Sequence, residues 1–81
     1  MEQMNNKIKE FIKKRFLGEV GGKLTERESL FEKGIVDSLG LLEVVAFIEK
    51  TYSISFNPSE ITIENFDTIE KIVQLIKAKL K

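Results

Sequence analysis

The sequence contains neither cysteine nor histidine. The lack of cysteine excludes a disulfide framework, a thiolate nucleophile and any cysteine-ligated metal. The lack of histidine removes the usual imidazole base and, with it, the Ser–His and Cys–His catalytic arrangements. Only carboxylates and lysines remain as acid–base groups, so the composition argues against a self-contained enzyme, and we expect no metal site.

Long hydrophobic runs are also missing. The longest apolar stretch, residues 39–48, is interrupted by Glu43 and is far shorter than the roughly 20 residues that cross a bilayer. The amphipathic N-terminus does not have the apolar block of a secretory signal. We therefore expect no membrane association and a cytoplasmic location.

Acidic and basic residues balance at 13 each, but they are unevenly placed. Residues 1–27 hold seven basic and four acidic side chains, whereas residues 28–52 hold two and five. The cluster at residues 13–15 falls at a predicted helix end, where cations meet the favourable end of the helix dipole. Because the most apolar predicted helix carries carboxylates, nucleic acid is not an expected partner.

The 81 residues, 42% of them hydrophobic and 32% charged, are enough for one core and too few for two. We expect a single domain over residues 1–81 and a monomer. Helical spacing of apolar residues predicts longer helices at 3–17, at 38–51 and after Asp67, and a short helix at 62–66. The predicted fold is all-α, a small four-helix bundle with a long structured loop between its first two helices.

Two connections complete the predicted fold. Residues 18–37 form a connection of unusual length, and five apolar side chains let it lie on the core: Leu24, Leu30, Phe31, Ile35 and Val36. Thr25 with Glu28 has the form of a capping box for a short helical turn, and Asp67 with Glu70 has that form for the last helix. Residues 52–59 are predicted to be an extended connector.

Ser38 lies where the long loop enters the second helix. Asp37 and Ser38 are both preferred N-cap residues, so a purely structural role competes with a functional one. However, Gly34, Ile35 and Val36 would anchor the loop and hold Ser38 at a fixed, exposed corner. A helix N-terminus favours a bound phosphate group. With no histidine or cysteine to activate Ser38, another enzyme would have to perform chemistry on it.

The stretch Gly-Ile-Val-Asp-Ser-Leu-Gly at residues 34–40 resembles the Asp-Ser-Leu site of acyl and peptidyl carrier proteins. Further landmarks of that family are matched at Leu30-Phe31, at residues 49–56 and at residues 60–66. The resemblance implies that Ser38 accepts phosphopantetheine from coenzyme A through a phosphopantetheinyl transferase. Acyl groups would then ride as thioesters on the arm's thiol, which would supply the sulfur that the chain lacks.

The resemblance also implies roles for neighbouring residues and for partners. Asp37 matches the aspartate that serves transferase and metal recognition, and Leu39 matches an apolar residue that partner enzymes contact. The expected partners are the transferase, an acyl-loading adenylating ligase or acyltransferase, and downstream acyl-processing enzymes of lipid, polyketide or related biosynthesis. The motif looks closer to discrete carriers such as the D-alanyl carriers than to the strongly acidic carriers of fatty acid synthesis.

The apolar residues of the second helix divide into two sets by helical spacing. The first set is assigned to the core and consists of Leu41, Val44, Val45 and Ile48. The second is assigned to partner docking and consists of Leu39, Leu42 and Ala46, with Glu43 beside them. Burial of both sets is the competing interpretation, and Phe47 belongs to neither set.

Two other functions stay open at this point. The chain could be an unmodified helical adaptor that docks through its second helix, with Ser38 acting only as a cap. A small enzyme that uses paired carboxylates such as Asp37 and Glu43 is disfavoured, because their six-residue spacing does not place them on one helical face.

Overall fold

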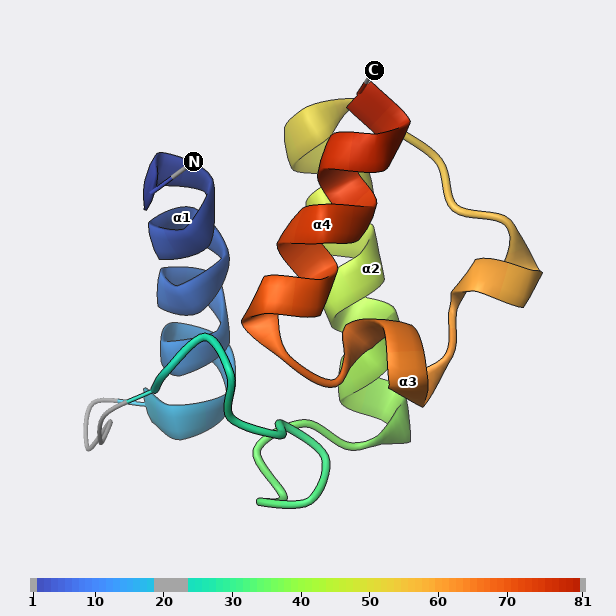
Figure 1. Ribbon diagram of the computed structural model, residues 1–81. Helices are drawn as coiled ribbons and strands as arrows, with labels where there is room; N and C mark the ends of the chain where they lie inside the picture. The colour runs from blue at the N-terminus through green and yellow to red at the C-terminus, as the bar shows by residue number, and fades with distance from the viewer. Residues whose placement is uncertain (1, 19–23, 81) are drawn as a thin grey trace.

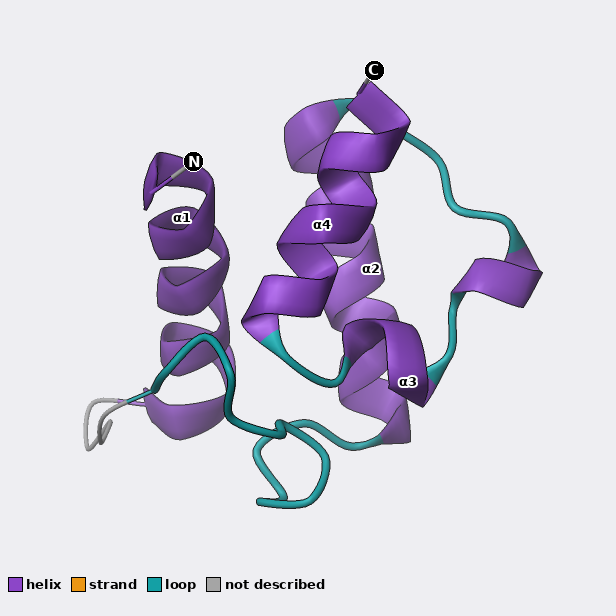
Figure 2. Cartoon of the chain, in the orientation of Figure 1, coloured by secondary structure: helices purple, strands orange, loops and turns teal. Residues whose placement is uncertain are grey.

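The computed structural model describes residues 2–18 and 24–80. Its helices, in chain order, are α1 (Glu2–Ile12), which continues into the π-helical turn η1 (Lys13–Leu17), α2 (Ser38–Tyr52), the 3-10 turn η3 (Pro58–Glu60), α3 (Ile63–Phe66) and α4 (Ile69–Leu80). Figure 1 shows α4 lying across α2, with α1 beside the pair. Within the described ranges there is helix and loop but no strand (Figure 2). The predicted all-helical fold, with three longer helices and a short one, is confirmed.

One hydrophobic core joins the three long helices. Ile8 and Ile12 enter it from α1, and Ile48 enters it from α2; each of these side chains is fully buried. The contribution of α4 follows its predicted helical spacing and consists of Ile69, Ile72, Val73 and Ile76. None of the helices in the described part of the chain is long and apolar enough to cross a membrane.

The described part of the long loop, residues 24–37, lies on this core as predicted. Leu24, Leu30 and Val36 are buried there. The Glu28 side chain bonds back to Thr25 as the predicted capping box requires, but the predicted short helix is absent, and the two residues close a single hydrogen-bonded turn. The Glu28 carboxylate accepts a hydrogen bond from the Thr25 N–H at 3.3 Å, and this bond holds the pKa of Glu28 below its usual value. No helix follows because the Leu30 N–H bonds instead to the Asp67 carbonyl, at 2.7 Å.

The predicted cap of the last helix is wrong by one residue. The Thr68 hydroxyl, not the Asp67 carboxylate, accepts the hydrogen bond from a first-turn N–H, that of Lys71, at 3.0 Å. Asp67 is engaged elsewhere, because its carboxylate accepts hydrogen bonds from the Ser29 hydroxyl at 2.7 Å and the Phe31 N–H at 3.3 Å. Asp67 therefore fastens the long loop to the junction of α3 and α4.

The predicted extended connector needs two corrections. Tyr52 is the last residue of α2, and Ser53 follows it in the left-handed conformation, with φ of 55°. Near the other end, residues 58–60 turn once as η3, where the Glu60 carboxylate accepts a hydrogen bond from the Asn57 N–H at 2.7 Å. Between them the chain is extended, and the Glu49 carboxylate holds the Phe56 N–H at 2.9 Å.

Candidate functional site

Ser38 is the first residue of α2, and its side chain is exposed. Asp37 caps the helix, because its carboxylate accepts a hydrogen bond from the Gly40 N–H at 2.7 Å and its carbonyl accepts the first helical bond, from Leu41, at 2.8 Å. Capping gives Asp37 a structural reason to stand beside Ser38. It also leaves Ser38 free of that task, so the Ser38 hydroxyl is open to other chemistry.

The loop that leads to Ser38 is held firmly just before the helix. The Leu30 carbonyl accepts hydrogen bonds from both Ile35, at 2.9 Å, and Val36, at 3.1 Å. Gly34 lies in the turn that these bonds close, with φ of 72°, a left-handed conformation that residues with a side chain adopt only with strain. With Val36 buried two residues ahead, Ser38 is presented from a fixed base, as the sequence predicted.

Gly40 is a structural requirement that the sequence analysis did not find. A Cβ atom at this position would lie 2.7 Å from the ring of Phe16 and 3.2 Å from the Asp37 carboxylate. The absence of a side chain therefore lets η1 pack against the first turn of α2. A signal was present, since glycine inside a helix costs about 1 kcal/mol relative to alanine and calls for a compensating reason.

The two faces predicted for α2 are separated in the structure. The core set is buried, and Leu39 and Leu42 are 74% and 58% exposed. Ala46 is exposed beside them, so the competing interpretation in which both sets are buried is wrong. Glu43 lies on the same side but is engaged by Arg15 of η1, whose Nε is 2.5 Å from the Glu43 carboxylate.

Phe47, which the sequence left unassigned, links α2 to α1. Its ring stacks on that of Phe11, with centroids 4.0 Å apart and planes 11° from parallel. The apolar spacing of the first helix was a signal for this contact, since it places Phe11 and Phe16 on the side that faces α2. Their partners on α2, Phe47 and Gly40, are set by the packing of the two helices, which the sequence pattern does not give.

The residues at the start of α2 fit a covalent phosphopantetheine arm. The Ser38 hydroxyl is exposed, and the first N–H groups of a helix have no partner within it. In the described part of the chain, we find no acceptor for the N–H groups of Ser38 and Leu39. These donors and the positive end of the helix dipole suit a phosphodiester at this position. Across the described residues, no group of three or more carboxylates is placed to hold a metal ion.

Comparison with known proteins agrees with this geometry. The family model described as "Phosphopantetheine attachment site" matches residues 6–76. The D-alanyl carrier proteins of Streptococcus pyogenes serotype M5 (strain Manfredo) and serotype M49 (strain NZ131) are each 40% identical to this chain over 47 residues. The match covers 58% of this chain and 60% of each relative.

A solved structure extends the similarity to the fold. A chain in a crystal structure titled "Crystal structure of FAD-dependent dehydrogenase" superposes with a TM-score of 0.76 at 29% sequence identity. The superposition covers 85% of this chain and 97% of that one. Since the family match spans most of the sequence, the chain belongs to the phosphopantetheine attachment site family, whose members are non-catalytic carrier proteins.

Proposed function

We propose that Ser38 is the residue of this carrier protein to which phosphopantetheine is attached, and that acyl or aminoacyl groups are carried on the arm as thioesters. The observation that carries the proposal is that Ser38, the first residue of α2, is exposed and follows a firmly anchored loop. A transferase needs an accessible acceptor oxygen whose position is defined. The N-terminus of α2 meets both needs.

Attachment requires one bond to form and one to break. The Ser38 oxygen bonds to the phosphorus of coenzyme A that bears the pantetheine, and the pyrophosphate bond breaks, so that adenosine 3',5'-bisphosphate leaves. The proton of the hydroxyl passes to a base of the transferase. Asp37 orients the start of α2 by accepting a hydrogen bond from the Gly40 N–H. We also assign this exposed carboxylate to transferase and metal recognition.

Similarity to D-alanyl carrier proteins supports loading of the arm by an adenylating ligase, with an acyltransferase as the other candidate. For docking on these enzymes and on the acyl-processing enzymes that follow, we assign the exposed side of α2: Leu39, Leu42, Glu43 and Ala46. Such contacts need to be weak, because one carrier must leave each partner quickly.

Intact-mass measurement after incubation with coenzyme A and a phosphopantetheinyl transferase tests the proposal. The wild type is expected to gain one phosphopantetheinyl group, and Ser38→Ala is expected to gain none. Ser55→Ala is the matched control, because Ser55 is also exposed but lies in the connector after α2; it is expected to react like the wild type. An unmodified wild type would favour the alternative, an adaptor that docks through Leu39 and Leu42.

A further inference from the structure

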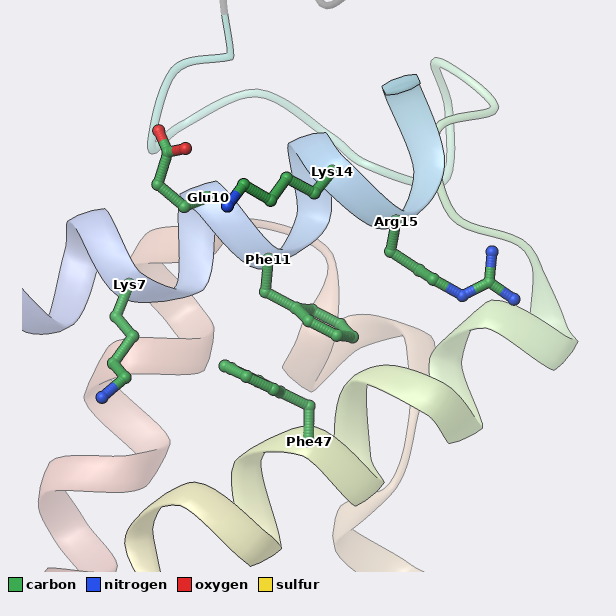
Figure 3. A pocket seen from close by; sticks show the side chains of 6 residues that line it. All are labelled: Lys7, Glu10, Phe11, Lys14, Arg15 and Phe47. Carbon is green, nitrogen blue, oxygen red and sulfur yellow. The ribbon is translucent and has the colours of Figure 1, made fainter. Parts of the chain in front are cut away.

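A groove runs between the first helical segment and α2, and Ser38 does not line it. Two hollows of about 420 and 360 Å³ share Phe11, Arg15 and Phe47 in their lining. We call this surface the aromatic groove and define it by Lys7, Phe11, Lys14, Arg15, Phe47 and Lys50. Figure 3 shows the two phenylalanine rings facing each other across the space between the helices.

The floor of the groove is the Phe11–Phe47 stack. Both rings are only partly buried and pack at the edge of the core. An aromatic pair that still meets solvent offers flat apolar area to an incoming apolar side chain. The floor therefore suits an aromatic or aliphatic group.

The rim of the groove is basic. Arg15 and Glu43 form an ion pair and balance each other. The remaining charges on the lining are those of Lys7, Lys14 and Lys50 against Glu10, and none of these three lysines has an ion-pair partner among the described residues. The chain as a whole has no net charge, so the positive charge is a local property of this surface.

We propose that the aromatic groove binds an acidic segment of a partner protein, with an apolar side chain of the segment against Phe11 and Phe47 and its carboxylates beside the lysines. The groove borders the predicted docking face, because Ala46 and Glu43 line its second hollow. The inference thus rests on the proposed carrier function and extends it, giving acyl-processing partners a second contact on the side of α2 that faces α1.

The charge pattern favours a protein segment over an anionic membrane. Glu10 lies in the lining, and its carboxylate would repel a continuous layer of lipid phosphates. A peptide can place its carboxylates beside the three lysines and avoid this position. Complementary charge of this kind mainly speeds encounter and selects partners, and it weakens with added salt.

Fluorescence anisotropy with two labelled peptides tests the proposal. One is an amphipathic peptide of glutamate, leucine and phenylalanine, and the other has lysine in place of every glutamate. The protein should bind the acidic peptide at least about tenfold more tightly than the basic one, a difference that shrinks with salt. Amide NMR shifts should map the acidic peptide to residues 7–15 and 43–50.

Variants of the groove then test which residues bind. The double variant Lys14→Glu with Lys50→Glu is expected to weaken binding of the acidic peptide by about tenfold or more, and Phe47→Ala by a similar factor. Lys71→Glu is the matched control, since Lys71 is exposed on α4 and lines neither hollow; it should change binding by less than about twofold. NMR spectra of each variant establish that it is folded, and a Phe47→Leu variant replaces Phe47→Ala if that one unfolds.

Three results would overturn the inference. They are equal binding of the two peptides, a loss of binding in Lys71→Glu as large as that in the Lys14→Glu, Lys50→Glu double variant, or NMR shifts centred on Leu39 and Leu42. Tighter association with phosphatidylglycerol vesicles than with the acidic peptide would assign the groove to a membrane instead. Ser38→Ala should bind the acidic peptide like the wild type. Modification at Ser38 and binding of the acidic peptide can therefore be lost independently, so each measurement tests a separate claim.

Discussion

The two sides of α2 are built from similar residues and meet opposite surroundings. Leu41, Val44 and Ile48 are at most 8% exposed, whereas Leu39 and Leu42 on the same helix are 74% and 58% exposed. The difference lies in what covers each side, since the buried one packs into the core shared with α1 and α4. Hydrophobicity alone therefore does not tell which residues stabilise the fold, and spacing along the helix does.

The largest expected effect tests this difference directly. Ile48→Ala leaves a cavity in the core and should lower the free energy of unfolding by about 2–5 kcal/mol. Leu42→Ala removes a side chain that is mostly in water and should change the free energy of unfolding by no more than about 0.5 kcal/mol. Urea unfolding of both variants provides the measurement. Similar losses in the two variants would mean that the exposed side is not exposed in solution.

Substitution of Gly40 tests the packing of the buried side of α2 against η1. Gly40→Ala forces the Phe16 ring to move from a 2.7 Å contact, and we expect a loss of about 1–3 kcal/mol in the free energy of unfolding. In a Phe16→Ala background the ring is absent, and the same change should cost less, because the helix propensity of alanine, worth up to about 1 kcal/mol, then opposes only the 3.2 Å approach to the Asp37 carboxylate. A loss that is equal in both backgrounds would show that the two residues do not contact each other.

Substitutions of Asp37 at the N-terminus of α2 separate its capping role from its predicted role in transferase recognition. Asp37→Ala removes the acceptor of the Gly40 N–H and should cost about 0.5–2 kcal/mol, whereas Asp37→Asn keeps a good cap and most of that stability. We expect both variants to be modified by the transferase more slowly than the wild type. If Asp37→Asn were modified at the full rate, Asp37 would be a cap alone.

The smallest expected effect concerns the carboxylate of Glu60 in η3. The hydrogen bond from Lys79, followed by that from the Asn57 N–H, lowers the pKa of Glu60 from its ordinary value of 4.5. The unfolded chain then binds a proton near pH 4.5 that the folded chain does not, so stability from Glu60 is present above that pH and is lost as pH falls through the lower folded pKa.

Thermal unfolding between pH 3 and 6 checks this expectation. Glu60→Gln should flatten the decline in stability below pH 4.5. Glu64→Gln serves as the control, because Glu64 is exposed on α3 and none of the ion pairs in the described ranges includes it. A steeper decline in Glu60→Gln than in the wild type would contradict the sign of the shift.

Most of the helices and the two sides of α2 could be predicted because helical spacing is a local property of the sequence. The core residues Leu41 and Ile48, and the exposed residues Leu39 and Leu42, follow from that spacing alone. The cap of α4 could not be predicted in the same way, since Asp67 and Thr68 are both capable caps. Contacts with the long loop decide between them, because Ser29 and Phe31 donate hydrogen bonds to the Asp67 carboxylate. Thr68 is then the residue that caps α4.

The surroundings of the candidate site depended on contacts between distant segments. Ser38 and Asp37 could be singled out from sequence, and their roles stay predictions. The packing of Phe16 on Gly40 and the stack of Phe11 on Phe47 join residues 24 and 36 positions apart. The pairing of Arg15 with Glu43 is of the same kind, and it gives a predicted docking residue an intramolecular partner.

Peptide mapping of the enzymatically modified protein is the most direct test of the central claim. Fragmentation mass spectrometry should find the phosphopantetheinyl group on Ser38 at the mouth of α2. A group on another serine, such as Ser29, Ser53 or Ser59, would contradict the account, as would a protein that the transferase leaves unmodified.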